Sequence, residues 1–223
     1  MSITTTGPDQ VVPAPDETAT GWSYEEAFSR HLGLVNEEEQ ERLRQSRVAI
    51  AGMGGVGGIH LITLARLGIG KFCVADPDTF EVANFNRQYG ANIRTLGKNK
   101  ALIMAEGVCT INPDASVRAF PEAITEKNVD AFLDGVDVLV DGIDFFALDH
   151  RRLLFQEARR RGIWVITAGP IGMSTAWLVF SPTGMSFDEY FAFDRAKDAL
   201  DRQIAFMLGL TPGATHRDRK SVV

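Results

Sequence analysis

The stretch AGMGGVGGIH, residues 51–60, separates an apolar run from a helical pattern and decides the fold class. Gly52, Gly54 and Gly57 fit the spacing G-x-G-x-x-G. The first glycine permits a tight turn, the second lets the backbone approach a phosphate, and the third lets the helix pack on the strand. The helix N-terminus offers free N–H groups to an anion. The loop indicates a nucleotide site, but NAD, FAD, S-adenosylmethionine and ATP all share the ribose or phosphate that it recognises.

Apolar runs and helical patterns alternate from residue 47 onward, as in a chain built of βαβ units. This alternation predicts an α/β fold, a Rossmann-like, doubly wound, mostly parallel sheet with helices on both faces. The run 174–180 is expected as an antiparallel strand, 188–210 as one helix, and Thr125 as the N-cap of a helix over 125–135. The other predicted strands are 47–52, 71–76, 116–120, 136–144 and 163–169, and the other predicted helices are 57–68, 98–112 and 148–162.

Changes of composition divide the chain into four segments. Residues 1–21, rich in Thr, Pro, Asp and Gly, are expected to form a disordered tail. Residues 22–46 are expected to form an N-terminal helical arm, with two short helices around LGLVN. The Rossmann-like domain then covers 47–210, and 211–223 is expected to be a flexible or truncated tail.

The composition is that of a globular protein without a large basic surface. The 223 residues are 45% hydrophobic and 23% charged, and the formal net charge is −6. This charge argues against broad nucleic-acid binding. Cys73 and Cys109 lie in apolar stretches and are expected to be reduced thiols in the core. No signal peptide and no run of about 20 apolar residues is found, so we expect a cytoplasmic protein without a membrane segment.

The segment DPDTFEVANFNRQYGANIRTLGKNKA, residues 76–101, discriminates between the nucleotides. It follows the second strand and gathers amide and cationic side chains at the edge where a doubly wound sheet binds ligands. ATP carries about four negative charges, which an arginine fork and a lysine point charge suit well. Asp141 ends a later strand at the same edge and is expected to hold magnesium on the phosphates. The sequence therefore favours a triphosphate.

Four motifs, GMGGVG, DPDTFEVANFNRQ, GKNKA and LVDGID, occur in an order and spacing that resemble the ubiquitin-activating-enzyme-like superfamily. This superfamily includes the ThiF, MoeB and HesA proteins and the threonylcarbamoyladenosine dehydratases. The resemblance implies an ATP-dependent adenylyltransferase, in which a substrate carboxylate attacks the α-phosphorus and pyrophosphate leaves. The implied substrates are a ubiquitin-like or sulfur-carrier-like protein, a small carboxylate, or an RNA-borne carboxylate such as that of a modified tRNA.

The resemblance also implies roles for the residues that match its motifs. Asp76 binds the ATP ribose, Asp141 positions magnesium, and Arg30 in FSRHLGL reaches into the ATP site of the partner subunit, which implies a homodimer. Asp78 is placed in the nucleotide site, the alternative being that it only caps the loop. Arg87 and Lys100 are expected to promote catalysis with Asp141 and Arg30. The other implied contacts to ATP are Gly52, Gly54, Gly55, Gly57, Asn84 and Gln88.

The chain departs from the superfamily pattern at several points. Both cysteines precede residue 110, so no thioester step is expected. No C-x-x-C pair is present, so no structural zinc is expected. Phe145 stands where asparagine is usual and Gly172 where some members have arginine, so we expect specialised handling of the substrate carboxylate.

Several residues are expected to have structural roles only. Asp144 is interpreted as a neighbour of the site or as a helix N-cap, and Trp164 and Trp177 as core residues of strands. Expected in packing or on the surface are His31, His60, Arg94 and Lys98, and expected on a solvated helix face are His150 and residues 151–161.

Two other functions are compatible with the same patterns. An NAD-dependent oxidoreductase would use the glycine loop, although no hydride-transfer site is recognisable. A non-catalytic scaffold that binds ATP or a partner is the third hypothesis, and the presence of Arg87, Lys100 and Asp141 counts against it.

Overall fold

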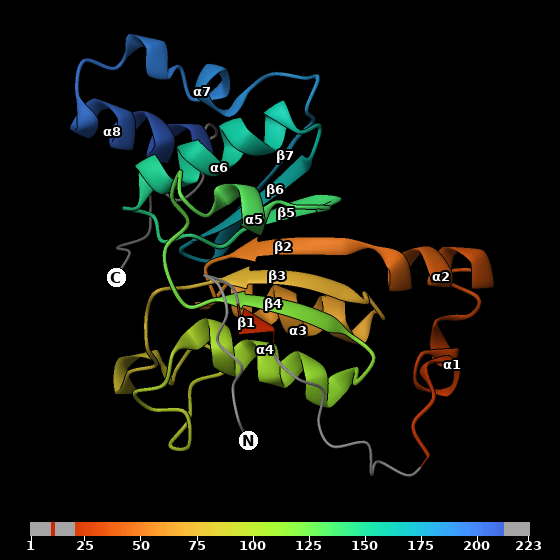
Figure 1. Cartoon of the computed structure of the whole chain (residues 1–223). Coiled ribbons are helices and arrows are strands. Elements are labelled where there is room, and N and C mark those ends of the chain that lie inside the picture. Colours follow the sequence, from red (N-terminus) through yellow and green to blue (C-terminus); the bar gives the residue numbers. More distant parts are fainter. Residues whose placement is uncertain (1–9, 12–20, 212–223) are drawn as a thin grey trace.

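The structure of the chain is a computed structural model, and it describes residues 10–11 and 21–211. One sheet of seven strands runs in the order β1-β4-β3-β2-β5-β6-β7 (Figure 1). The strands are β1 Gln10–Val11, β2 Arg47–Ala51, β3 Lys71–Ala75, β4 Ser116–Phe120, β5 Val138–Asp141, β6 Trp164–Ile171 and β7 Ser174–Phe180. The α-helices are α1 Tyr24–Ala27, α2 Glu37–Gln45, α3 Gly57–Arg66, α4 Lys100–Ile111, α5 Val129–Phe132, α6 Leu148–Arg160, α7 Phe187–Tyr190 and α8 Ala199–Leu210. The 3-10 turns are η1 Ser29–His31, η2 Val82–Asn84 and η3 Phe193–Arg195.

The five strands β4-β3-β2-β5-β6 are parallel, and β7 pairs antiparallel with β6. The chain winds outward from β2 in both directions, because β3 and β4 lie on one side of it and β5 and β6 on the other. This arrangement confirms the doubly wound, mostly parallel sheet and the antiparallel last strand that the sequence predicts. The carboxyl ends of β2 and β5 form the topological switch point, where sheets of this kind bind ligands.

Strand β2 contributes to two hydrophobic cores, because successive side chains of a strand point to opposite faces. Val48 and Ile50 pack with residues of α3 and α4 on one face. Ala49 belongs to the core under α5, α6 and α8 on the other face. Figure 1 shows these two helix layers below and above the sheet. Cys73 and Cys109 are buried and free, as predicted.

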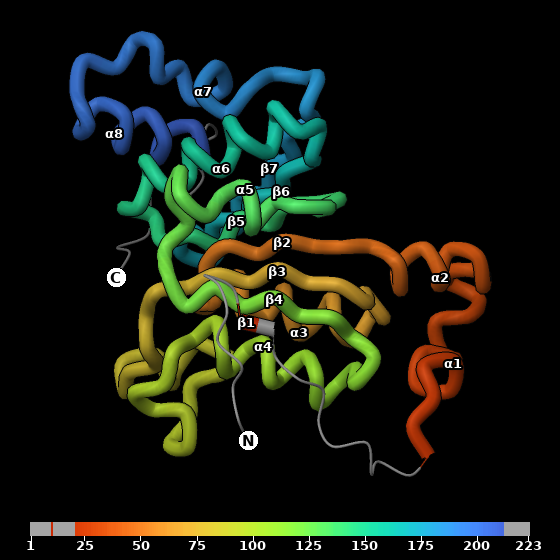
Figure 2. The backbone as a smooth tube through the Cα atoms, viewed as in Figure 1, coloured from red at the N-terminus to blue at the C-terminus, as the bar shows by residue number. Residues whose placement is uncertain are grey.

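The N-terminal arm packs at the amino ends of the strands. Its helices α1 and α2 flank LGLVN as predicted, and Asn36 begins α2 with a capping box to Glu39. The Tyr24 hydroxyl donates to the Gly68 carbonyl at 2.6 Å and accepts from the Gln40 amide at 3.0 Å. These bonds fasten the arm to the end of α3, far from the carboxyl ends of the strands (Figure 2).

The single helix predicted over 188–210 is wrong. Helix α7 ends at Tyr190, Ala192 takes a left-handed φ of 52°, and α8 begins only after its N-cap, Asp198. Tertiary packing accounts for the break, because it lets aromatic rings from three short elements meet over one core. The rings that meet are Phe187, Phe191, Phe193 and Phe206.

Two further local predictions are corrected. Thr125 does not cap α5, which is a single turn that begins after Asn128. The Asn128 Oδ1 accepts the Thr125 N–H at 2.8 Å, which closes a turn where a helix was expected. Gln10–Val11 lie in the predicted tail but pair with β4. The other residues of that tail, and 212–223 of the predicted C-terminal tail, lie outside the described residues.

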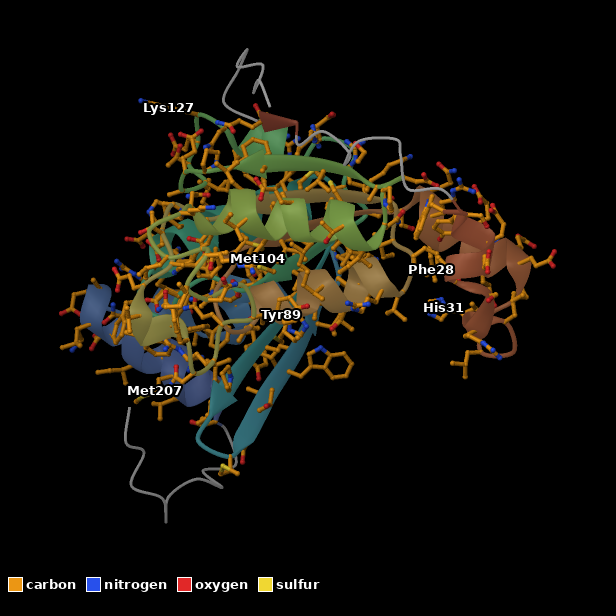
Figure 3. All side chains as sticks on the ribbon, turned by 90° about the horizontal axis from the view of Figure 1, so that it is seen from below. Phe28, His31, Tyr89, Met104, Lys127 and Met207 are labelled. Atoms are coloured by element: carbon orange, nitrogen blue, oxygen red, sulfur yellow. The ribbon has the colours of Figure 1, made fainter. Side chains whose placement is uncertain are left out.

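The two tryptophans expected in the core lie on the surface of the sheet. Trp164 is 49% exposed and Trp177 is 69% exposed. They share one face of β6 and β7 with Ile166 and with Val179, which is paired directly with Ile166. Seen from the side of α3 and α4, the β6–β7 hairpin extends beyond both helices (Figure 3). Within the described residues this face of the hairpin therefore lacks a covering helix.

In the part of the chain that the structure describes, no helix is both long and apolar enough to cross a bilayer. The cytoplasmic location stays a prediction.

Backbone segments meet at the switch point without room for side chains. Gly52 has a φ of +89°, and a Cβ there would lie 2.2 Å from the carbonyl oxygen of Gly142. A Cβ on Gly57 would lie 1.8 Å from the carbonyl oxygen of Gly52. The Gly142 N–H donates to the Ala51 carbonyl at 2.8 Å. Glycine at these positions therefore lets α3 and the end of β5 close on the end of β2.

We expect Gly52→Ala to lower the free energy of unfolding by roughly 2–5 kcal/mol, because left-handed strain of roughly 1–2 kcal/mol adds to overpacking of roughly 1–3 kcal/mol. Gly97→Ala is the matched control, since Gly97 has a φ of +76° but nothing within 4 Å of an added Cβ. It should lose about 1–2 kcal/mol, from strain alone. Urea unfolding measures both losses, and equal losses would contradict the steric constraint at Gly52.

Candidate active site

The glycine loop between β2 and α3 faces the long loop that follows β3. A Cβ on Gly54 would lie 3.8 Å from the Gln88 Nε2, and a Cβ on Gly55 would lie 3.4 Å from the Arg87 carbonyl oxygen. At neither position would an added Cβ lie closer than 3.4 Å to a neighbouring atom, whereas at Gly52 it would lie 2.2 Å from backbone. The structure thus brings together two segments that the sequence assigned to one nucleotide site. Helix α3 starts at the same place, so the positive end of its dipole faces this edge.

Asp76 links the two loops. Its Oδ2 accepts the Met53 N–H of the glycine loop at 2.6 Å, and its Oδ1 accepts the Asp78 N–H at 2.8 Å. Only 5% of Asp76 is exposed. Burial raises the pKa of its carboxyl, and the two N–H bonds and the charge of Lys100 oppose that shift only in part. A carboxylate has about four acceptor positions, so Asp76 keeps capacity for a further hydroxyl donor.

The long loop after β3 is built around buried amide side chains. Asn84 is buried, and its Oδ1 accepts the Glu81 N–H at 2.9 Å, which closes the turn η2. Gln88 is 8% exposed, and its Oε1 has no partner although the atom is buried. Arg87 is exposed, and its guanidinium is held at the loop surface by the Ala83 carbonyl at 2.8 Å. An arginine and a buried amide with free capacity thus lie beside the glycine loop.

Lys100 occupies the first turn of α4 and turns back towards the site. Its Nζ lies 3.0 Å from the Asp78 Oδ2, and its N–H donates to the Asp78 carbonyl at 2.9 Å. The Lys100 side chain is 8% exposed, whereas that of Asp78 is 67% exposed. A nearly buried cation is therefore held at the edge of the site by one exposed carboxylate. Asp78 joins Lys100 to Asp76 through its side chain and its N–H, and its place in the nucleotide site stays a prediction.

We expect Asp141 to face the crevice openly, but the structure places its side chain inside the protein. It is 3% exposed, and its Oδ2 accepts from the Arg151 Nε at 2.7 Å and from the Thr167 Oγ1 at 2.8 Å. Its Oδ1 accepts the Ile143 N–H at 3.0 Å. The burial of a cation beside Asp141 is the physical reason, because two opposite charges are removed from water together. This carboxylate is thus engaged inside the protein.

Asp144 lies three residues further on and is exposed. Its Oδ2 accepts the Phe146 N–H at 2.9 Å. The N-cap of α6 is Ala147, without a side-chain cap, so the N-cap interpretation of Asp144 is wrong. The exposed carboxylate at the end of β5 is therefore Asp144.

Arg151 is the residue at this site that the sequence interpretation missed. It was expected on a solvated helix face, yet it is 4% exposed. The signal was present, because Arg151 falls at helical spacing between Leu148 and Leu154, on the apolar face of α6. A charged residue on a core face indicates a buried partner.

Arg30 lies in η1, in the arm, and is exposed. The arm is at the amino ends of the strands and the glycine loop at their carboxyl ends (Figure 2). Arg30 is thus not brought together with the other predicted site residues of its own chain.

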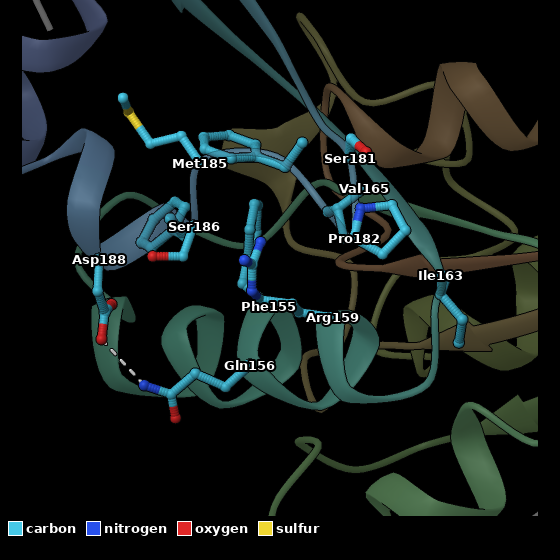
Figure 4. Close-up of a pocket in the computed structure, with 12 residues that line it drawn as sticks. Phe155, Gln156, Arg159, Ile163, Val165, Ser181, Pro182, Met185, Ser186 and Asp188 are labelled. Carbon is cyan, nitrogen blue, oxygen red and sulfur yellow. Dashed lines mark hydrogen bonds between the residues drawn. The ribbon is translucent and has the colours of Figure 1, made fainter.

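A small pocket of about 80 Å³ lies elsewhere, between α6, the start of β6 and residues 181–188 (Figure 4). Phe155, Val165, Pro182 and Met185 line much of it. None of the predicted site residues contributes to it, so it is separate from the nucleotide site.

Within residues 10–11 and 21–211, no group of three or more His, Cys, Asp or Glu side chains is placed to hold a metal ion. A magnesium ion at this site would therefore depend on ligands from the nucleotide. The expected absence of structural zinc stays a prediction.

The model of the ThiF family matches residues 28–214 of the chain. The chain is 36% identical over 154 residues to the tRNA threonylcarbamoyladenosine dehydratase of Haemophilus influenzae, a match that covers 69% of this chain and 58% of the relative. It is 37% identical over 138 residues to the SAMP-activating enzyme E1 of Haloferax volcanii, covering 61% of this chain and 50% of the relative. These matches confirm the resemblance found in the motifs.

Among solved structures, the fold is similar to that of the Escherichia coli tRNA threonylcarbamoyladenosine dehydratase in complex with ATP. The TM-score is 0.61 at 30% identity, and the match covers 66% of this chain and 62% of that chain. This chain therefore spans between half and two thirds of the length of these relatives.

The raised pKa of Asp76 predicts how stability depends on pH. The folded protein binds this proton more tightly than the unfolded chain, so the group stabilises the fold below its ordinary pKa of 3.8, and that contribution is lost as the pH rises through the folded pKa. Relative to Asp76→Asn, the wild-type protein should therefore gain unfolding free energy as the pH falls from about 7 to about 4.5. Urea unfolding at several pH values tests this. A constant difference, or one that moves towards the variant, contradicts it.

Proposed function

The chain belongs to the ThiF family, and we propose that it is an ATP-dependent adenylyltransferase that converts a substrate carboxylate into an acyl-adenylate. One observation carries the proposal. The glycine loop lies against Arg87 and Gln88, and Asp76 ties that loop to the Asp78–Lys100 pair. Cations and N–H donors thus gather where a triphosphate would sit, which suits ATP better than a nicotinamide dinucleotide. A relative of similar fold has been solved with ATP.

In the proposed reaction, an oxygen of the substrate carboxylate bonds to the α-phosphorus of ATP. The bond between the α-phosphorus and its bridging oxygen breaks, and pyrophosphate leaves with the electron pair. No protein nucleophile is required, so catalysis depends on positioning and on stabilising charge at the phosphoryl oxygens. Both cysteines are buried, which supports a reaction without a thioester step.

The proposed roles follow from where the residues lie. Asp76 accepts ribose hydroxyls, and Asp78 holds Lys100 until the triphosphate competes for it. Arg87 presents an exposed fork to the phosphates. The backbone of Gly52, Gly54, Gly55 and Gly57 and the side chains of Asn84 and Gln88 complete the nucleotide site.

Magnesium that is bound to a nucleotide is usually held by one or two protein carboxylates together with the phosphates. The end of β5 offers two carboxylates for this role, those of Asp141 and Asp144. Asp141 is surrounded by donors from Arg151, Thr167 and Ile143. Asp144 is exposed on the same loop. We therefore propose Asp144 as the carboxylate that holds magnesium, and Asp141 as a residue that positions it. When bound, the ion would neutralise charge on the phosphates.

The proposed protein is a homodimer in which Arg30 acts on the partner's site. Arg30 is exposed at the end of the sheet away from its own glycine loop. The face of β6 and β7 that carries Trp164, Trp177 and Val179 is apolar and exposed, and such patches mark protein interfaces. We propose that a second copy of the chain covers this face.

The substrate carboxylate belongs to a ubiquitin-like or sulfur-carrier-like protein, to a small molecule, or to a modified RNA. Relatives are named for action on tRNA and for activation of small protein modifiers. Phe145 and Phe146 form an edge-to-face pair at the end of β5, with Phe146 72% exposed. This apolar corner would contact the substrate beside its carboxylate.

We expect Lys100→Met to weaken ATP binding about tenfold or more, because the variant lacks the cation that faces the phosphates. AMP binding should change less than about twofold, since AMP lacks the β- and γ-phosphates. Lys98→Met is the matched control, as Lys98 lies two residues away and is exposed. Calorimetric titration of the three proteins with ATP and with AMP measures these changes. Equal ATP affinities for Lys100→Met and Lys98→Met would remove Lys100 from the site.

A mixture of Arg30→Ala and Lys100→Met proteins tests the partner role of Arg30. Each variant alone should lack high-affinity ATP sites. After exchange of subunits, half of the dimers contain one of each chain, and each of these has one intact site, so about a quarter of all sites should bind ATP tightly. Titration with ATP before and after mixing counts the high-affinity sites. If their number does not rise on mixing, a contribution of Arg30 in trans is excluded.

A further inference from the structure

We infer that Arg151 is a positioning residue, which together with Asp141 clamps the backbone of Ile143 and so holds Asp144 at the nucleotide site. The inference rests on the proposed function, because it gives Asp144 a task there. It concerns a residue outside the family motifs found in the sequence.

The Asp141–Arg151 pair binds both the N–H and the carbonyl of one backbone residue, Ile143. The Ile143 N–H donates to the Asp141 Oδ1 at 3.0 Å, and the Ile143 carbonyl accepts from the Arg151 Nη2. The Arg151 Nε closes the ring by donating to the Asp141 Oδ2 at 2.7 Å. Both polar groups of one backbone residue are thus fixed by one buried ion pair. Because Asp144 follows directly, the clamp fixes where its exposed side chain starts.

The opposite side of this segment rests on the glycine loop. A Cβ on Gly142 would lie 2.9 Å from the Gly52 carbonyl oxygen and 2.9 Å from the Gly57 nitrogen. Gly142 therefore lies against the glycine loop, the next residue, Ile143, is bound by the Arg151 guanidinium, and Asp144 follows directly. If Arg151 shifted, residues 142–144 would be able to move away from the glycine loop.

Stability alone does not account for this arrangement. A buried ion pair is a weak source of stability, because desolvation offsets most of the attraction. Arg151 also leaves its Nη1 buried without a partner, which is unfavourable. The planar fork is what allows one side chain to donate to Asp141 and to Ile143 at the same time, whereas a lysine offers one point charge.

Helix α8 supports the same corner. The Arg151 guanidinium lies 4.8 Å from the centre of the Phe206 ring, and that ring packs on Phe145 at 5.3 Å. Phe145 directly follows Asp144 in the chain. The C-terminal helix thus holds both the cation and the loop that the cation clamps.

The neighbouring residue of α6 provides a matched control. Arg152 also pairs with an aspartate, Asp188, at 2.8 and 3.0 Å, and its guanidinium lies 5.4 Å from the Phe193 ring. Arg152 makes no described bond to residues 142–147. Its loss removes an arginine–aspartate pair and an aromatic contact without touching the proposed site.

The test is the factor by which Mg²⁺ strengthens ATP binding, measured by titration with and without the metal. We expect Arg151→Lys to reduce this factor about tenfold, as for groups that orient metal ligands, and Asp144→Asn to abolish it. The factor for Arg152→Lys should match that of the wild-type protein. Adding Arg151→Lys to Asp144→Asn should not weaken ATP binding in the presence of Mg²⁺ any further, because Arg151 acts through Asp144.

Two readouts separate positioning from a general loss of structure. Amide hydrogen exchange of residues 142–147 should accelerate in Arg151→Lys and not in Arg152→Lys, with or without nucleotide. Thr167→Val, which removes one donor to Asp141, should shift the Mg²⁺ factor in the same direction by less, and it serves if Arg151→Lys fails to fold.

The outcomes are distinguishable. A wild-type protein that does not bind ATP refutes the proposed function and this inference with it. If the wild-type protein binds ATP and the Mg²⁺ factor is the same for Arg151→Lys and Arg152→Lys, only the positioning role is refuted. If ATP affinity in the presence of Mg²⁺ is lower in the double variant than in Asp144→Asn, Arg151 does not act through Asp144, which also overturns the inference.

Discussion

The contact between backbone segments at the ends of β2 and β5 is the constraint on which the site depends. Gly52, Gly57 and Gly142 approach so closely that no Cβ fits between them. The end of β2, the start of α3 and the segment after β5 are therefore held as one unit, as in the close-packed interior of a protein. The loops that carry the charged groups begin from these fixed points.

Around this contact, each charged group that the proposed reaction needs is already held by a protein partner. Met53 holds Asp76 through its N–H, Asp78 holds Lys100, and Arg151 holds Asp141. Groups held in advance need little rearrangement when charge develops on a phosphoryl group, and this is where electrostatic stabilisation is most effective. The side chains of Asp78, Arg87 and Asp144 are exposed, and the last two suit contact with an anion and with a metal ion.

The parts of the structure that depend on local pattern could be predicted from the sequence. The glycine spacing and the alternation of strands and helices identified the sheet, its switch point and the loop that carries Arg87. The failures concern residues whose place is set by distant parts of the chain. Arg151 is buried by its partner Asp141, Trp177 is exposed because no described helix covers its face of β7, and the chain breaks at Ala192 where aromatic rings converge. No window of sequence contains those partners together.

The central claim is that the carboxyl edge of this sheet is a triphosphate site and not a nicotinamide site. Calorimetric titration of the wild-type protein with Mg-ATP, and separately with NAD and NADH, tests it most directly. We expect Mg-ATP to bind with a stoichiometry of about one per chain, and NAD and NADH not to bind. Binding of NADH without binding of Mg-ATP would contradict it, because the loop around Arg87 would then serve another purpose.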